Sequence, residues 1–352
     1  MVYYIRFLKT PRFEQQKAQV FISALICITT DLGDDFLAED VDLIATWAVR
    51  FSRENVSSKR FRWQAGARQL PIQIPVHLSL AQMNNAPHAA VLEVHPQNSS
   101  IIHHVLGESS MPLVVSGCSD HFHWPSGGAA DKLIQREFKI NEQGSEVLKI
   151  WEETGNSIAR HIWDAALASM IILRKAILGA TELPDLDRLL HSSRSSPLQV
   201  VELGAGCGIV GITLAVMLNQ VQMLLTDLPE VEEIIMRNIH SNSPRPDSSV
   251  TFQTLDWDDP PADLCSQPID LILVSDCTYN ADSLPTLVSV LDRLVRRSPD
   301  ALVLVALKRR HDSEAIFFDL MQEAGFTAKQ TTVSLPAQYG EIQLIEVYAY
   351  RR

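Results

Sequence analysis

From residue 197 onward, apolar positions come in short runs that alternate with longer segments of helical length. Residues 198–203 are short and rich in valine and leucine, which is typical of a buried strand, and residues 209–218 are long enough for a buried helix. Strands that alternate with helices predict a parallel sheet covered on both faces. The other predicted strands are 223–227, 250–257, 269–275 and 301–307, and the other predicted helices are 230–242, 284–297 and 313–324.

The end of the chain departs from this alternation. Residues 329–335 and 342–350 are predicted strands, and only Pro336-Ala-Gln-Tyr-Gly-Glu341 lies between them. A connection that short fits an antiparallel hairpin and is too short for the crossover between parallel strands. We therefore expect a parallel sheet that finishes in an antiparallel hairpin, which is not the arrangement of a nucleotide-binding dehydrogenase.

Residues 1–130 show a different pattern, in which strand-like apolar runs are mixed with turn clusters such as residues 96–100. Helical periodicity is visible only around residues 41–51. We therefore predict a small N-terminal α+β accessory region over residues 1–130 and an α/β domain over residues 131–352.

The two regions are joined by a predicted hairpin. Residues 136–140 and 146–150 alternate polar and apolar side chains, and the turn between them contains Asn141 and Gly144. A helix is predicted to follow over residues 157–177, because apolar or small side chains recur there at helical spacing.

Composition narrows the class of protein. Of the 352 residues, 46% are hydrophobic, which is enough for a packed core, and the formal net charge is −12. That charge disfavours nucleic-acid binding and favours a basic partner such as a lysine-rich peptide. Five cysteines without paired spacing are typical of reduced thiols, so we expect a cytoplasmic or nuclear protein. The apolar segment 18–30 is too short to cross a bilayer, so we expect a buried strand there and no membrane association.

A glycine-rich turn, Glu202-Leu-Gly-Ala-Gly-Cys-Gly208, joins the first predicted strand of the sheet to the helix after it. Its glycines let the backbone turn sharply and approach a ligand closely. Residues 206–211 also fit the G-x-G-x-x-G pattern of dinucleotide enzymes, but that match is weak by itself. The carboxylate at the start of the turn suits the ammonium group of S-adenosylmethionine, whereas a pyrophosphate gains nothing from it; a tight turn without any ligand is the third possibility. The candidate cofactor residues of this turn are Glu202, Gly204, Ala205 and Gly206.

Two further strand ends carry candidate cofactor residues. Asp227 ends the next strand, where a carboxylate can accept hydrogen bonds from ribose hydroxyls, and it can also cap the following helix. Asp256 and Trp257 end the third strand, where the adenine should lie. We expect Trp257 to stack on the base and Asp256 or nearby backbone to bind its amino group; a plain core tryptophan is almost as good an interpretation.

The segment Asp276-Cys-Thr-Tyr279 follows the fourth predicted strand. Ligands of open α/β sheets bind outside the carboxyl ends of the strands, so a carboxylate and a phenol there can hold an amine beside a methyl donor. We expect Asp276 to accept a hydrogen bond from the nitrogen and Tyr279 to direct its lone pair. Such a reaction depends on positioning and desolvation. A loop cap for Asp276 and ordinary packing for Tyr279 are the alternatives.

The segment Trp163-Asp-Ala-Ala166, the glycine-rich turn, Asp227, Trp257 and the Asp276-to-Tyr279 segment together resemble the seven-strand lysine methyltransferase family. The resemblance covers about residues 132–352 and implies a Rossmann-like α/β sheet of seven strands and S-adenosylmethionine as the methyl donor. It also implies that Trp163 and Ser275 line the cofactor pocket, although relatives often have alanine in place of Ser275. Family members modify chaperones, a AAA ATPase and elongation factors, so the resemblance implies a protein substrate with an accessible lysine, such as an elongation factor or a chaperone.

Other classes of function are weighed against this hypothesis. A small-molecule methyltransferase and a catalytically inactive binding protein of the same fold are the alternatives, and a nicotinamide oxidoreductase ranks last. Cys118, His121 and His123 are poorly spaced for zinc, so we expect a surface loop there and no metal.

Overall fold

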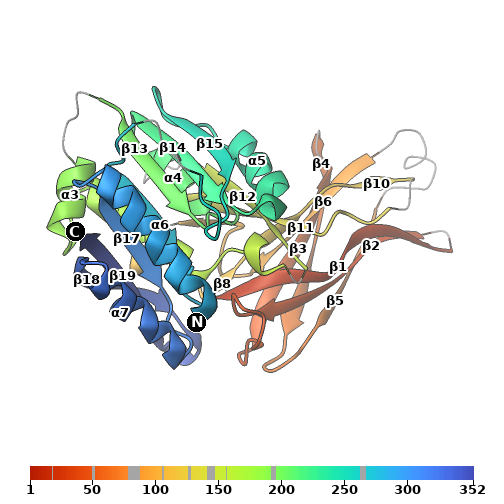
Figure 1. Ribbon diagram of the computed structural model, residues 1–352. Helices are drawn as coiled ribbons and strands as arrows, with labels where there is room; N and C mark the ends of the chain where they lie inside the picture. The colour runs from red at the N-terminus through yellow and green to blue at the C-terminus, as the bar shows by residue number, and fades with distance from the viewer. Residues whose placement is uncertain are drawn as a thin grey trace.

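The computed structural model describes residues 1–17, 19–49, 52–77, 88–104, 107–125, 128–140, 147–155, 157–191, 196–261 and 267–352. Figure 1 shows two parts side by side, a sheet covered by helices and a second part built of strands. The predicted turn residues Asn141 and Gly144 and the cysteine Cys265 lie outside the described residues.

The helix-covered part is a seven-stranded sheet in the order β15-β14-β13-β16-β17-β19-β18. The first five strands of this order are parallel, and β19 runs antiparallel to both β17 and β18. The predicted parallel sheet with a terminal antiparallel hairpin is therefore confirmed. The strands are β13 (Leu198–Leu203), β14 (Val221–Asp227), β15 (Ser249–Thr254), β16 (Leu271–Ser275), β17 (Leu302–Leu307), β18 (Thr327–Pro336) and β19 (Ile342–Arg351).

Helices cover both faces of this sheet because side chains along each strand alternate between two cores. On β17, Leu302 and Leu304 belong to the core beneath α2 and α4, whereas Val303 and Val305 belong to the core beneath α6 and α7. The α-helices are α2 (Asp164–Ile177), α3 (Pro184–His191), α4 (Ile209–Met217), α5 (Glu232–Ser241), α6 (Leu284–Arg297) and α7 (Ile316–Glu323).

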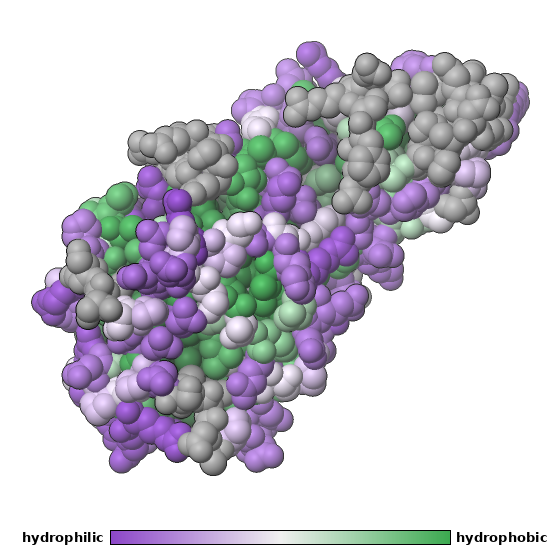
Figure 2. Space-filling view, turned by 90° about the horizontal axis from the view of Figure 1, so that it is seen from above, coloured by the Kyte–Doolittle hydropathy of each residue, from purple (hydrophilic) through white to green (hydrophobic). Residues whose placement is uncertain are grey.

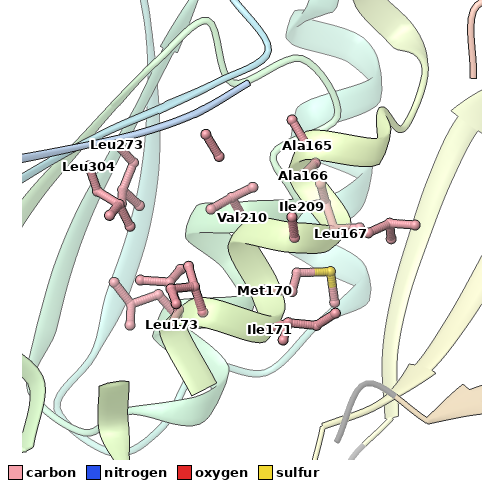
Figure 3. Close-up of a cluster of buried hydrophobic side chains, with 14 of the residues drawn as sticks. Ala165, Ala166, Leu167, Met170, Ile171, Leu173, Ile209, Val210, Leu273 and Leu304 are labelled. Atoms are coloured by element: carbon pink, nitrogen blue, oxygen red, sulfur yellow. The ribbon is translucent and has the colours of Figure 1, made fainter. Parts of the chain in front are cut away.

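Helix α2 lies in the middle of one of these cores. Figure 3 shows Leu173 of α2 and Val210 of α4 on the side of Leu273 and Leu304 of the sheet, and Met170 of α2 belongs to the same core. The helix begins at Asp164, not at residue 157 as predicted, because Trp163 is extended and only a 3₁₀ turn, η2 (Ile158–Arg160), precedes it. Helix α3 was not predicted from the sequence.

The strand-built part corrects the prediction of an α+β region. The segment predicted as helical, around residues 41–51, contains strand β3 (Val41–Val49), in which Leu43, Ala45 and Trp47 are buried with a period of two. Within the described residues of 1–130, the one helical element is the 3₁₀ turn η1 (Glu108–Ser110). The N-terminal region is therefore β-structured and not α+β.

Two sheets form this part, one in the order β5-β2-β1-β8 and one in the order β12-β11-β9-β6-β3-β4, with β10 paired to β6 and β7 to β11. The predicted buried strand within residues 18–30 is confirmed as β2. The remaining strands are β1 (Tyr3–Gln16), β2 (Gln19–Thr29), β4 (Ser52–Trp63), β5 (Leu70–Pro75), β6 (His88–Pro96), β7 (Ile102–His104), β8 (Val114–Val115), β9 (Gly117–Ser119), β10 (Phe122–Trp124), β11 (Leu133–Lys139) and β12 (Val147–Glu153).

Strands β11 and β12 form the predicted antiparallel hairpin, and they also belong to the larger N-terminal sheet. The two parts of the chain share core residues as well: on β1, Tyr3 faces the N-terminal core, whereas Tyr4 belongs to the core that contains α2 and α4. The division at residue 130 stays a prediction. Cys118 lies buried on β9 and the exposed His123 lies on β10, so the expected surface loop was wrong for these two residues, whereas His121 lies in the loop between the strands.

The surface mixes polar and apolar side chains. Figure 2 shows hydrophilic residues spread over one face, with apolar residues reaching the surface between them. Among the described residues, the longest apolar helix falls short of what crossing a membrane requires.

Candidate active site

A cavity of about 280 Å³ lies at the carboxyl ends of β13, β14 and β16. Strand order reverses between β13 and β16, and open α/β sheets bind their ligands at such a switch point. The structure brings every predicted site residue to this one cavity. Its lining includes Trp163, Glu202, Gly204, Ala205, Gly206, Asp227, Asp256, Trp257, Ser275, Asp276 and Tyr279.

The glycine-rich turn passes so close to other parts of the cavity wall that side chains would not fit. Gly204 and Gly206 have positive φ angles of 66° and 55°. A Cβ atom on Gly204 would lie 2.5 Å from Cys277 Sγ, and one on Gly206 would lie 2.9 Å from the carbonyl oxygen of Ala159. Both positions therefore need glycine, for conformation as well as for space.

Asp227 connects this turn to the end of β14. Its Oδ2 accepts a hydrogen bond from the backbone N–H of Gly206 at 2.7 Å, and its Oδ1 accepts one from the N–H of Leu228 at 2.7 Å. Burial raises the pKa of this carboxyl. Each carboxylate oxygen can accept a further hydrogen bond, so Asp227 can hold the turn and ribose hydroxyls together. The ribose contact itself stays a prediction.

Asp227→Ala is expected to weaken S-adenosylmethionine binding by at least about tenfold, since hydrogen bonds to a charged group contribute about 1.5–3 kcal/mol each. Isothermal titration calorimetry measures the affinity. Asp300→Ala, at an exposed position outside the cavity lining, is the control. Equal affinity in Asp227→Ala and wild type would refute the assignment.

Glu202 lines the cavity but is only 2% exposed, and its Oε2 accepts a hydrogen bond from the backbone N–H of Gly211 at 2.7 Å. Burial raises its pKa to about 8, so the carboxyl is protonated at neutral pH in the protein without ligand. The expected contact with the cofactor's ammonium stays a prediction, and a cation placed there would lower this pKa.

The raised pKa of Glu202 predicts a pH dependence of stability. The folded state holds a proton on Glu202 that the unfolded chain releases near pH 4.5, so this group destabilises the fold progressively from about pH 4.5 to about pH 8. Glu202→Gln, which carries no such proton, should lose less stability than wild type over that range. Urea unfolding at several pH values measures it, and parallel pH profiles of the two proteins would contradict the prediction.

The other predicted cofactor residues differ in how the fold holds them. Trp257 packs beside Gly204, whereas Asp256 is exposed and its Oδ1 accepts a hydrogen bond from the N–H of Asp258 at 2.9 Å. The Ser275 hydroxyl lies 2.7 Å from the hydroxyl of Ser169 on α2. This hydrogen bond links the end of β16 to α2. The roles of Trp257 and Asp256 in binding the adenine base stay predictions.

Asp276 has a partner that the sequence did not predict. The Arg310 guanidinium donates to both of its carboxylate oxygens, from Nη1 at 2.7 Å and from Nη2 at 2.6 Å. Burial raises the pKa of Asp276, while the ion pair with Arg310 acts in the opposite direction. The Arg310 guanidinium also lies 5.0 Å from the centroid of the Trp163 ring. Tyr279, by contrast, is 58% exposed at the edge of the cavity.

Sequence reasoning missed Lys308, Arg310 and Asp31, which surround Asp276. The sequence could have indicated Lys308 and Arg310. Both directly follow the apolar strand β17, so they lie at the same edge of the sheet as Asp276. Asp31 carries no such signal, since it comes from the N-terminal region. Within the described residues, no cluster of three or more His, Cys, Asp or Glu side chains is arranged to hold a metal ion.

The strand order, the glycine turn at the switch point and the carboxylates around the cavity together define a methyltransferase that uses S-adenosylmethionine. The residues present fit that cofactor: the glycine positions leave room for it, Glu202 and Asp227 suit its ammonium and ribose, and the Trp257 ring offers an apolar surface for its base.

Comparison with known proteins then identifies the family. The family model described as lysine methyltransferase matches residues 142–324, which is half of the chain, so the protein belongs to that family. The chain is 26% identical over 323 residues to the UPF0665 family protein C23C4.06c of Schizosaccharomyces pombe, with 90% of this chain and 91% of that protein covered. It is 28% identical to the protein-lysine N-methyltransferase rrg1 of the same organism, over 62% of this chain and 70% of the relative. It is also 28% identical to the protein N-lysine methyltransferase METTL21A of Danio rerio, over 55% and 81%.

The three alignments cover different lengths of this chain. The first covers 90% of it, so it must include most of the N-terminal strands. The other two cover 62% and 55%, which is about the length of the helix-covered part. The N-terminal β region therefore has a counterpart in at least one relative.

Proposed function

We propose that this enzyme methylates the ε-amine of a lysine in a protein, and that the lysine enters the cavity between Asp276 and Tyr279. The observation that carries this proposal is that Asp276 and Tyr279 line the same cavity, with Asp276 buried and Tyr279 largely exposed. A long, narrow side chain with a terminal amine could contact the exposed phenol and still reach the buried carboxylate.

The chemistry of the site supports an amine acceptor. Bound S-adenosylmethionine supplies an electrophilic methyl group on its sulfonium, and only an amine without its extra proton can attack it. A lone buried carboxylate would stabilise the unreactive ammonium form. Because Arg310 is paired with Asp276, this charge is offset, and the carboxylate can orient a neutral amine through a hydrogen bond. Tyr279 would cover the aliphatic part of the lysine and exclude water.

The partner is proposed from the family resemblance and from charge. An elongation factor or a chaperone with an accessible lysine is the proposed substrate, and the net charge of −12 favours a basic surface around that lysine. The proposed location is the cytoplasm or the nucleus. A small-molecule substrate is the second candidate, since the cavity alone does not exclude a small amine.

The experiment that tests the function is methyl transfer from radiolabelled S-adenosylmethionine into a cell extract, followed by acid hydrolysis of the labelled protein. A discrete labelled protein band that yields methyllysine supports the proposal. Label found only in the small-molecule fraction would replace it with the second candidate. Confirmed cofactor binding without any label would indicate an inactive binding protein.

A further inference from the structure

A buried group of charged side chains lies behind Asp276, where the N-terminal strands meet the seven-stranded sheet. Its centre is Asp31, which follows β2 and is 1% exposed. Asp31 Oδ1 accepts a hydrogen bond from Lys308 Nζ at 2.9 Å. Its Oδ2 accepts hydrogen bonds from Arg310 Nη2 at 2.9 Å and from the backbone N–H of Asp164, the first residue of α2, at 3.2 Å.

Arg310 connects Asp31 to the methyl-transfer site. The same guanidinium holds both carboxylate oxygens of Asp276 and lies over the Trp163 ring. A planar fork fixed between two carboxylates and an aromatic ring has little rotational freedom. The orientation of Arg310, and with it that of the Asp276 carboxylate, therefore depends on Asp31.

The charges of this group keep Asp31 ionised. Burial opposes its charge, but the neighbouring Lys308 and Arg310 cations outweigh burial, so the pKa of Asp31 is lowered. Burial and the nearby Asp31 charge raise the pKa of Asp164 to about 6. Both carboxylates are therefore largely ionised at neutral pH, and Lys308 Nζ donates to Asp164 Oδ2 at 2.8 Å as well as to Asp31. Asp31 is the carboxylate of the two that accepts a hydrogen bond from Arg310.

The N-terminal strands hold Asp31 in place. Arg6 of β1 donates a hydrogen bond from Nη2 to the carbonyl oxygen of Asp31 at 2.7 Å. Tyr4 of β1 donates its hydroxyl to Asp164 at 3.0 Å. The same strand therefore fixes both the Asp31 backbone and the start of α2.

We propose that Asp31 is a positioning residue for methyl transfer, which acts through Arg310 on Asp276 and Trp163, so that the N-terminal β region completes the active site of the sheet domain. The inference rests on the proposed function, because it assigns to Asp276 the role of orienting the acceptor amine. Asp31 itself is not among the residues that line the cavity.

The test is a double-mutant cycle on the rate of methyl transfer. The acceptor is the protein that the wild-type enzyme labels in a cell extract, kept at a fixed amount, and the concentration of tritiated S-adenosylmethionine is varied. Asp31→Asn should lower the apparent kcat by on the order of 100-fold while the apparent KM for the cofactor changes little. In an Arg310→Gln background the same substitution should have almost no further effect, because its route to Asp276 is already broken. Asp42→Asn, an exposed carboxylate on β3 that pairs with Arg62, is the matched control and should keep wild-type rates.

Two outcomes would overturn the proposal: an unchanged kcat in folded Asp31→Asn, or losses in the single variants that simply multiply in the double variant. If Asp31→Asn does not fold, Arg310→Lys decides instead. Lysine keeps the charge but cannot bridge two carboxylates with a planar fork, so kcat should fall at least tenfold; wild-type kcat in that variant refutes the proposal.

A measurement that does not depend on enzyme activity tests this proposal independently of the proposed function. The backbone N–H of Lys308 donates to Asp276 Oδ1 at 3.3 Å, so loosening of Arg310 should expose it. Hydrogen–deuterium exchange over residues 307–310 should be faster in Asp31→Asn than in wild type. Unchanged exchange would contradict the positioning role even if the enzyme proved to have another substrate.

Discussion

Asp276→Asn is expected to lower the rate of methyl transfer by about 100-fold or more while cofactor affinity is spared, since misplacing a reacting group by about 1 Å costs on that order. Asparagine keeps the size of the side chain, but it lacks the second carboxylate oxygen and the charge that the Arg310 fork binds. It also tolerates the backbone conformation, since Asp276 has a φ of 58°, a left-handed value that asparagine adopts more readily than alanine does.

The measurement compares initial rates with labelled S-adenosylmethionine and calorimetric affinities for the cofactor. Asp247→Asn is a matched control, because Asp247 is exposed, lies outside the cavity lining and also has a positive φ, of 60°. Full activity in Asp276→Asn would mean that the carboxylate does not orient the acceptor. Lost cofactor binding in a protein that still unfolds cooperatively would assign Asp276 to the cofactor.

Arg136→Met is expected to lower the free energy of unfolding by about 3–5 kcal/mol, the usual cost of leaving one partner of a buried ion pair without the other. Arg136 on β11 and Glu152 on β12 are both fully buried. Arg136 Nε donates to Glu152 Oε1 at 2.7 Å, and its Nη1 donates to the carbonyl oxygen of Ser116 at 2.8 Å. Methionine fills much of the space but leaves the Glu152 charge and that carbonyl oxygen without this partner.

Chemical denaturation measures this loss. Arg12→Met is the control, because Arg12 forms an exposed ion pair with Glu14, and such pairs contribute about 0–1 kcal/mol. The loss should shrink when Glu152→Leu is combined with Arg136→Met, since an apolar pair removes the uncompensated charge. A difference of less than about 1 kcal/mol between Arg136→Met and wild type would show that the pair does not stabilise the β11–β12 hairpin.

The local pattern of apolar residues was sufficient to predict an element wherever the contacts that decide its structure lie close in the chain. Helix α6 spans the predicted residues 284–297 because its leucines and valines repeat at helical spacing between clear turn signals. Strand β3 was predicted wrongly because a short apolar run fits a helix or a strand, and its pairing with β4 and β6, which no local pattern records, decides between them. The predicted start of α2 was also wrong, because His161 and Trp163 are extended and separate the η2 turn from the helix.

The sequence by itself was enough to predict that the candidate cofactor residues lie together at one edge of the sheet. Glu202, Asp227, Ser275 and Asp276 each lie at or just beyond the carboxyl end of a strand, and parallel strands bring those ends to one edge of the sheet. Only the tertiary structure decided what surrounds Asp276. Arg310 lies 34 residues from Asp276 and 279 from Asp31, and no spacing rule connects them. Their meeting depends on how the N-terminal strands pack against the sheet, because a buried charge requires partners but does not specify which part of the chain supplies them.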